Sequence, residues 1–256
     1  MPAIADAIIL KNGAKTFQQD EDSPTYVLKG VDLTIEKGQF YILLGPSGCG
    51  KSTLLNIIAG FLELSEGNLE IVTSNTNRDG RGFVFQSADS ALFPWLTVEE
   101  NIAFGLKMKK VPTEERKKIA EHYIKLTGLT GHAKKFPDNL SGGMKQRVQL
   151  ARVLANEPEI LLMDEPFGAL DAMTRRSMQN ELIRIWRETN KTIIFVTHDI
   201  QEAIILGQKI GIMSVGPSSK ITTTYDVKLS YPRDLTTAEF NDCYRRVQAH
   251  FEDYGI

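Results

Sequence analysis

The sequence predicts an α/β fold with a mostly parallel sheet core, an antiparallel β region at the N-terminus and an inserted helical segment. The apolar run Phe40–Leu44 stops at a glycine and a proline, as expected of a parallel strand buried on both faces. The apolar runs Ile160–Met163 and Thr192–Val196 flank a long helical pattern over Ala172–Glu188. A strand, a helix and a second strand in this order indicate a right-handed parallel crossover.

The other β segments have weaker patterns. Apolar residues alternate only partially over Val27–Ile35, and Glu36–Gly38 has the composition of a turn. Near the C-terminus, Ile210–Met213 and Ile221–Thr224 are short strand candidates, and a last helix is predicted at about Thr236–Phe251.

The stretch between the β-rich parts has a helical pattern. Thr113 is suited to be an N-cap, and the two acidic residues after it suit the first turn of a helix. The sequence therefore predicts a β-rich core at 1–86 and 160–256 and a helical subdomain at 87–159, together forming one domain over 1–256. The helices predicted before and within this subdomain are Lys51–Gly60, Val98–Leu106, Thr113–Thr127 and Gly142–Ala155.

The composition excludes several classes of protein. The 256 residues carry 30 Lys and Arg against 32 Asp and Glu, and this balance predicts no nucleic-acid partner. The two cysteines, Cys49 and Cys243, form no disulfide framework, which favours a reducing compartment. Met1–Leu10 lacks the pattern of a signal peptide, and the apolar runs are shorter than the roughly 18–20 residues that span a bilayer. Any membrane role is therefore expected to come through a partner.

A phosphate-binding motif lies between the predicted strand and helix. Gly45–Ser52 matches G-x-x-x-x-G-K-[ST], the P-loop, in the strand–loop–helix context that confirms it. A chance match somewhere in a chain of this length has odds of about 1% from average residue frequencies. We expect Lys51 to neutralise charge on the β- and γ-phosphates and Ser52 to bind Mg²⁺. The residues predicted to hold the nucleotide here are Gly45, Pro46, Ser47, Gly48, Cys49, Gly50, Lys51, Ser52 and Thr53.

Two carboxylates end the second predicted strand. Asp164 follows Ile160–Met163 and is placed to reach the shell of a Mg²⁺ ion. Alternation along a strand would turn Glu165 to the opposite face, where it could polarise a water for attack on the γ-phosphate. Without the phosphate motif upstream, the same pair would be interpreted as a solvated acidic turn.

A second helix start has the character of an anion site. Ser141, Gly142 and Gly143 open a helical pattern, and the N-terminus of a helix attracts negative charge. One nucleotide has one γ-phosphate, so two such sites in a chain predict a head-to-tail pair of chains, each completing the site of the other. Taken alone, Ser-Gly-Gly is an ordinary helix start.

In order and spacing, these motifs resemble those of the ABC-family ATPases. Leu140–Arg147 resembles the signature motif and Phe83–Gln86 the Q-loop. Gly168–Asp171 resembles the D-loop and Val196–Asp199 the H-loop, so the resemblance covers nearly the whole chain. The resemblance implies a P-loop, RecA-like core at 1–86 and 160–256, and an ATPase with ATP and Mg²⁺ as cofactors.

The resemblance also implies roles for single residues. Gln86 would contact Mg²⁺ or the attacking water, and His198 the γ-phosphate. Asp171 would shape the dimer contact, and Ser141–Gly143 would hold the ATP of the partner. Phe17 would stack on adenine, with Tyr26 as the alternative. One position departs from the pattern, because Met144 stands where the commonest signature motif has glutamine.

The residue pattern after the Q-loop resembles that of the nitrate, sulfonate, taurine and bicarbonate importer branch. Phe93, Trp95 and Leu96 lie in this stretch and suit a groove that receives a helix of a permease. Internal packing of the helical lobe is the alternative for each of these residues. The short tail around Tyr231–Asp234 resembles the same branch.

The resemblance therefore predicts the ATP-hydrolysing subunit of a small-anion importer at the cytoplasmic face of a bacterial inner membrane. Its expected partners are permease subunits, a second ABC ATPase subunit and, indirectly, a periplasmic or lipid-anchored solute-binding protein. The alternatives are another ABC importer or exporter, and a non-transport ABC ATPase in DNA repair or translation. A DNA-repair ATPase would have a long coiled coil between Lys51 and Leu140, and a translation ATPase two such domains.

Overall fold

The computed structural model describes residues 5–18, 24–74 and 80–253. The chain forms two compact units, Met1–Ser74 with Asn190–Ile256 and, inserted between these segments, Asn75–Thr189. The predicted boundaries at 86 and 160 stay a prediction. The α/β class, with a mostly parallel core and an antiparallel N-terminal sheet, is confirmed.

The first unit contains a three-stranded antiparallel sheet with the order β2-β1-β4. Strand β1 spans Asp6–Gln18, β2 spans Pro24–Glu36 and β4 spans Glu66–Ile71. Strands β1 and β4 had no sequence prediction. Register shifts such as that between Leu10 and Gly13 interrupt β1, so its buried side chains do not keep the period of two on which strand prediction depends.

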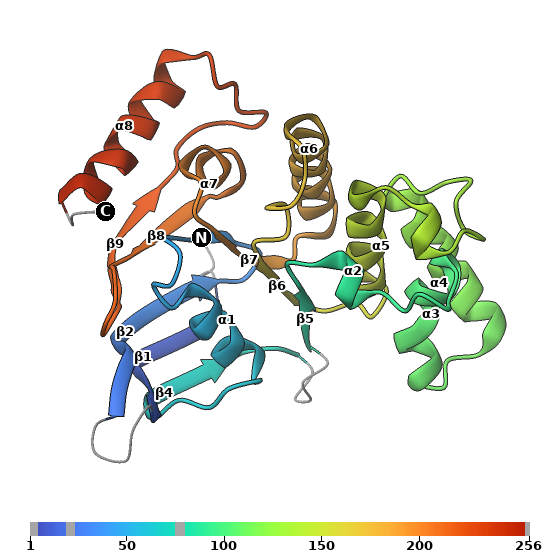
Figure 1. The fold of residues 1–256 in the computed structure, drawn as a ribbon, viewed down its shortest axis with the longest axis horizontal. Coiled ribbons are helices and arrows are strands. Elements are labelled where there is room, and N and C mark those ends of the chain that lie inside the picture. The colour runs from blue at the N-terminus through green and yellow to red at the C-terminus, as the bar shows by residue number, and fades with distance from the viewer. Residues whose placement is uncertain (1–4, 19–23, 75–79, 254–256) are drawn as a thin grey trace. The chain divides into compact units, whose positions relative to one another are not determined.

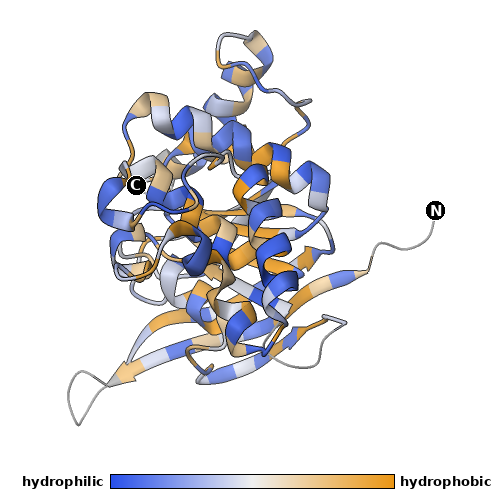
Figure 2. Ribbon diagram, turned by 90° about the vertical axis from the view of Figure 1, so that its right-hand side faces the viewer, coloured by the Kyte–Doolittle hydropathy of each residue, from blue (hydrophilic) through white to orange (hydrophobic). Residues whose placement is uncertain are grey.

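The same unit holds the strands that carry the phosphate motif, in the order β7-β3-β8-β9. These are β7 (Thr192–Thr197), β3 (Phe40–Leu44), β8 (Lys209–Met213) and β9 (Ile221–Asp226). Strand β3 runs parallel to both neighbours, and β9 is antiparallel to β8. Every residue of β3 and β7 is buried, and Figure 2 shows the apolar residues gathered along the strands.

Three helices belong to this unit: α1 (Lys51–Ala59), α7 (Ile200–Leu206) and α8 (Ala238–Asp253). Helix α7 packs against β3 and β7, and α8 packs on α7 (Figure 1). Helix α7 had no sequence prediction, because seven residues are too few to establish a helical period.

The second unit combines two strands with the helices of the insert. Strand β5 (Arg81–Val84) pairs in parallel with β6 (Ile160–Asp164). Helix α5 packs against β5 and against four helices, α2, α3, α4 and α6. The helices of the unit are α2 (Ala88–Ala91), α3 (Val98–Met108), α4 (Thr113–Leu126), the 3₁₀ helix Pro137–Asn139, α5 (Gly142–Leu154) and α6 (Ala172–Thr189).

One predicted cap is wrong. Helix α4 is preceded by Pro112 as its N-cap, and Thr113 is already its first residue. The Thr113 hydroxyl oxygen instead accepts a hydrogen bond from the Arg116 guanidinium, 3.2 Å away. Helix α3 has a complete capping box, since Thr97 accepts from the Glu100 amide while the Glu100 carboxylate accepts from the Thr97 amide.

Candidate nucleotide site

The loop between β3 and α1 depends on its glycines. Gly48 and Gly50 have φ angles of +82° and +88°, which residues with a Cβ atom rarely adopt. Gly50 precedes α1 without any side chain capping the helix, and the following Ser52 is exposed. The first N–H groups of α1 therefore face an open loop, the arrangement in which helix N-termini bind phosphate.

Lys51 brings a cation into this loop. Its side chain is buried, at 4% exposure, and its ammonium donates hydrogen bonds of 2.7 Å to the carbonyl oxygens of Gly45 and Pro46. The thiol of Cys49 lies 3.9 Å from the same ammonium, and burial raises the pKa of this thiol. A cation at the base of a loop of backbone N–H groups favours an anion in that loop.

His198 lies beside this loop. Strand β7 pairs with β3 so that Thr197 faces Leu44, and His198 and Gly45 therefore leave the same edge of the sheet as neighbours. The Thr197 hydroxyl donates to the Glu202 carboxylate over 2.7 Å and accepts from the Asp199 amide over 3.0 Å. These bonds fix the backbone on both sides of the exposed histidine.

Asp199 is the N-cap of α7 and had no predicted role of its own. Its carboxylate accepts hydrogen bonds from the amides of Gln201 and Glu202, at 2.8 and 3.1 Å. An aspartate followed three residues later by a glutamate is the signature of a helix start, and this signal could have been used to predict α7.

The structure distinguishes the two aromatic candidates for an adenine contact. Phe17 on β1 is 39% exposed and pairs with Thr25 on β2. Tyr26 is engaged, because its hydroxyl donates to the Glu66 carboxylate over 2.8 Å and the Lys29 ammonium lies 4.5 Å from its ring centre. The hydrogen bond to Glu66 also raises the pKa of Tyr26. The Lys15 ammonium likewise lies 5.3 Å from the ring centre of Phe17, so the hydrogen bond between Tyr26 and Glu66 is the contact that favours Phe17.

Strand β2, which carries the partner of Phe17, lies against the phosphate loop. A Cβ atom on Gly50 would meet the side chains of Leu28 and Val27 at 2.9 and 3.2 Å. Thr25 is two residues from Val27, or about 7 Å along a strand. Phe17 therefore belongs to the surroundings of the loop.

In the second unit, Gln86, Asp164 and Glu165 lie at one edge. The parallel strands β5 and β6 end together, with Val84 facing Met163. Gln86 is exposed two residues beyond β5, Asp164 is the last residue of β6 and Glu165 follows it. The side chains predicted to act on water and Mg²⁺ thus come from the ends of adjacent strands.

The predicted reason for the orientation of Glu165 is wrong. Strand β6 ends at Asp164, and Glu165 has a φ angle of +40°. A left-handed backbone turn, rather than alternation along a strand, therefore sets its direction. Such a conformation costs about 1–3 kcal/mol in a residue other than glycine and is found mostly at functional sites.

The predicted signature and D-loop residues also lie together in the second unit. Ser141 caps α5 by accepting from the Met144 amide over 3.4 Å, and Ser141 and Gly142 are exposed. Gly143 lies directly against Thr174 of α6, leaving no room for a Cβ atom.

Asp171 is the cap of α6. Its carboxylate accepts hydrogen bonds from the amides of Met173 and Thr174 at 3.1 and 3.0 Å. Hydrogen bonding from the Thr174 side chain and backbone lowers the pKa of Asp171. The helix start next to Gly143 thus depends on Asp171, a structural role that the sequence did not predict.

The chain thus contains a phosphate-binding loop, a strand with acidic residues at its end, and a second exposed helix start. The family model for the ABC transporter matches residues 28–168. The chain belongs to the ABC transporter family. The predicted resemblance is confirmed, and ATP is the nucleotide of these ATPases.

Two relatives of this ABC ATPase are import proteins. This chain is 44% identical over 248 residues to the aliphatic sulfonates import ATP-binding protein of Bacillus subtilis, and the similarity covers 96% of this chain and 94% of the relative. It is 46% identical over 212 residues to the taurine import ATP-binding protein of Pelagibacter ubique, covering 82% and 79%.

A solved ATP-binding cassette is also similar. That dimeric cassette, in a post-hydrolysis state with ADP and Pi, is 36% identical, with a TM-score of 0.74. The similarity covers 87% of the ABC ATPase and all of the cassette. Within the described ranges of the ABC ATPase, no helix is both long and apolar enough to cross a bilayer.

Proposed function

We propose that this ABC ATPase hydrolyses ATP to power the uptake of a small oxyanion, with sulfonates as the first candidates. The observation that carries the proposal is the glycine loop after β3, in which Lys51 bonds to the Gly45 and Pro46 carbonyls, while His198 follows the paired strand β7. The two import relatives support the direction of transport and the chemistry of the transported molecule. Nitrate and bicarbonate are further candidates, because the residue pattern after the Q-loop resembles an importer branch that includes their transporters.

The residues of the loop bind the phosphates. Gly45–Thr53 present backbone N–H groups, and Lys51 exchanges its carbonyl partners for β- and γ-phosphate oxygens. Phe17 stacks on adenine, and His198 contacts the γ-phosphate. Gly48 has no neighbour within 4 Å of a would-be Cβ atom, which leaves the loop open on that side.

Glu165 acts as the base in this proposal. Its carboxylate takes a proton from the water that attacks the γ-phosphate, and Gln86 orients that water. Ser52, Gln86 and Asp164 offer a hydroxyl, an amide and a carboxylate oxygen, the hard ligands that Mg²⁺ prefers. When bound, Mg²⁺ neutralises charge that develops on the phosphate oxygens.

A second copy of the chain completes each site. Ser141, Gly142 and Gly143 bind the ATP held by the partner, and Asp171 contributes to the dimer contact. The similarity to a dimeric cassette supports this arrangement. Binding of ATP then closes the dimer and hydrolysis reopens it, a switch between two states that the ligand biases.

The dimer docks on permease subunits at the cytoplasmic face of a bacterial inner membrane. Trp95 is 69% exposed and its ring centre lies 5.6 Å from that of Phe93, so an aromatic surface faces outward in this part of the second unit. Such a surface suits the docking of a helix. A periplasmic or lipid-anchored solute-binding protein delivers the anion to the permease.

Affinity capture tests this function. The Glu165→Gln chain, with ATP present, is used to capture partners from detergent-solubilised native membranes. We expect a multi-span permease and a solute-binding protein, which can then be titrated with taurine, alkyl sulfonates, nitrate and bicarbonate. Recovery of ribosomal or DNA-bound proteins alone would overturn the transport function while leaving the ATPase chemistry intact.

A further inference from the structure

A two-residue link joins β7 to α7 and carries His198. Strand β7 ends at Thr197, His198 and Asp199 follow, and α7 begins at Ile200. Every residue of β7 is buried, whereas His198 is exposed. The function proposed above requires this histidine at one place, on the γ-phosphate, so a short exposed segment has to be held in a fixed conformation.

Three hydrogen bonds close a ring around this link. The Thr197 hydroxyl donates to the Glu202 carboxylate over 2.7 Å. The Glu202 amide donates to the Asp199 carboxylate over 3.1 Å, and the Asp199 amide donates to the Thr197 hydroxyl over 3.0 Å. The ring therefore starts and ends at the last residue of the strand, and His198 lies in the chain between two of its members.

The ring differs from the ordinary capping box of a helix. In a capping box, the side chain at the third helical position accepts directly from the amide of the N-cap residue. Here Asp199 is the N-cap and Glu202 holds the third position, but the Thr197 hydroxyl stands between the two groups. A direct bond would suffice to start α7. The inserted hydroxyl adds a connection from the helix to the end of β7.

The ring is withdrawn from water. Thr197 is 2% exposed and Glu202 is 7% exposed. A buried carboxylate costs free energy unless hydrogen bonds compensate it, and hydrogen bonds are stronger where water is excluded. Helix α7, which supplies the carboxylate, packs against β3 and β7. The ring is therefore a rigid joint between the strand and the helix.

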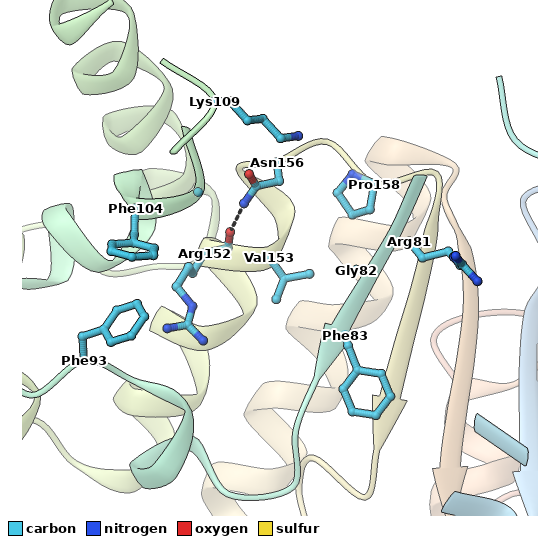
Figure 3. A pocket seen from close by; sticks show the side chains of 11 residues that line it. Arg81, Gly82, Phe83, Phe93, Phe104, Lys109, Arg152, Val153, Asn156 and Pro158 are labelled. Carbon is cyan, nitrogen blue, oxygen red and sulfur yellow. Dashed lines mark hydrogen bonds between the residues drawn. The ribbon is translucent and has the colours of Figure 1, made fainter. Parts of the chain in front are cut away.

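Some other buried polar side chains are less completely bonded. Arg152 lines a pocket of about 390 Å³ in the second unit and extends towards Phe93 (Figure 3), and its Nη1 atom has no acceptor in the described part of the chain. Among the described residues, both polar atoms of the Gln149 side chain also lack partners. The Thr197 hydroxyl instead both donates and accepts. Complete bonding is thus not general among the buried polar groups, and it occurs at the joint that carries His198.

We propose that Glu202 is a positioning residue of the ATPase reaction, acting through the Thr197 hydroxyl to hold His198 at the γ-phosphate. The inference rests on the proposed function, which assigns His198 to that phosphate. A contact to a reacting group depends on exact placement, and a displacement of about 1 Å can lower a rate by about 100-fold. The ring restricts the backbone on both sides of His198, and Glu202 itself needs no contact with the nucleotide.

Turnover at saturating ATP tests the positioning. Thr197→Val and Glu202→Met remove the hydroxyl and the carboxylate with little change in side-chain volume. We expect each to lower kcat by about 10- to 100-fold and to leave ATP affinity nearly unchanged, because the phosphate loop is intact. Thr197→Ser and Glu202→Gln keep a hydroxyl and an acceptor oxygen, so each should restore most of the rate. Full rates in both Thr197→Val and Glu202→Met would overturn the proposal.

A matched control lies at the other end of the same strand. Thr192 is 3% exposed, and its hydroxyl accepts a hydrogen bond from the Gly38 amide over 3.0 Å. Thr192→Val therefore removes a buried hydroxyl from β7 and leaves the joint intact. It should keep the wild-type rate. An equal fall in Thr192→Val and Thr197→Val would show a general effect on the strand and overturn the positioning.

A double-mutant cycle separates positioning from an independent effect. His198→Ala alone should lower kcat, and adding Thr197→Val to it should lower kcat no further, because a positioning residue acts only through the side chain that it positions. The same additional fall in both backgrounds would overturn the proposal. A wild-type rate for His198→Ala would instead remove His198 from the γ-phosphate and overturn that part of the proposed function, whatever the rate of Thr197→Val.

A spectroscopic measurement needs no turnover. The chain has four histidines, whose side-chain signals are observed by nuclear magnetic resonance after labelling with ¹⁵N-histidine. Comparison with His198→Ala identifies the signal of His198. We expect Thr197→Val and Glu202→Met to shift or broaden this signal, while the signals of the other histidines stay in place. An unchanged His198 signal in both variants would overturn the positioning even if their rates fall.

Discussion

Lys51 shows how much of the site is formed by a single side chain. Its ammonium donates hydrogen bonds to two carbonyls of its own loop, and these bonds hold it at the loop that the motif assigns to phosphate. The identity and position of this residue followed from the motif. Its two carbonyl partners did not, because the motif specifies residue types and not the hydrogen bonds that the lysine makes within its own loop.

Replacing Lys51 by alanine should weaken ATP binding by about 10- to 100-fold, the range for loss of a hydrogen-bonded charged group. Titration with a fluorescent ATP analogue measures this change. Lys220→Ala, at an exposed position of the same unit, serves as the control. Unchanged affinity in Lys51→Ala would contradict the assignment of the loop.

The orientation of Glu165 was predicted from alternation along a strand, and that reason was wrong. Its left-handed backbone breaks the strand before the carboxylate, and no pattern of apolar residues encodes such a turn.

Glu165→Gln should retain ATP binding and lower turnover by roughly 10²–10⁴, because an amide cannot accept the proton of the attacking water. Phosphate release at saturating ATP measures the rate. Glu188→Gln, on the exposed surface of α6, should have the rate of the wild type. A rate near wild type for Glu165→Gln would remove this residue from the role of base.

Among the helices and strands, the prediction was most accurate for strands that consist of one continuous apolar run and are fully buried. Phe40–Leu44 was predicted with the bounds that the structure gives, and Gly142–Ala155 was predicted with the correct start and an end one residue too late. Strand β1 was missed because its bulges disturb the alternation, and β5 was reached only through its resemblance to the Q-loop. Helix α7 is short and is specified by its cap rather than by a period.

That cap gives a prediction for α7. Asp199→Ala should lower the free energy of unfolding by about 1 kcal/mol, whereas Asp199→Asn, which can still accept the amide hydrogen bonds, should lose much less. Urea unfolding followed by circular dichroism measures both. Equal loss in the two variants would show that charge, rather than capping, stabilises this end of the helix.

The other end of α7 depends on Arg233. Its guanidinium donates to the carbonyls of Ile204, Gly207 and Leu229, the last over 3.1 Å, and it stacks 4.0 Å from the ring centre of Tyr231. Arg233→Met should therefore destabilise the chain by about 2–4 kcal/mol, since buried carbonyls at a helix end lose their donor. The shift of the urea midpoint measures it, and Arg245→Met, at an exposed position on α8, should shift the midpoint little.

At the scale of the whole molecule, the head-to-tail dimer predicts complementation. Ser141→Arg and Lys51→Ala chains should each be inactive alone. In a mixed dimer, Lys51 of one chain and Ser141 of the other form one intact site. Random pairing then restores roughly a quarter of the wild-type ATPase rate, because half of the dimers are mixed and each has one of two sites. A mixture as inactive as its components would contradict composite sites.

The division of the chain into units has a consequence for its synthesis. The strand that carries the phosphate loop, β3, has β7 and β8 as its neighbours, and both are made only after residue 190. During translation, β3 and α1 therefore emerge with both flanking strands still missing and their apolar side chains uncovered. The inserted unit, Asn75–Thr189, is continuous in sequence and is complete before its host. Assembly of the first unit is thus delayed by its topology, and its apolar strand stays exposed to aggregation until β7 and β8 are made.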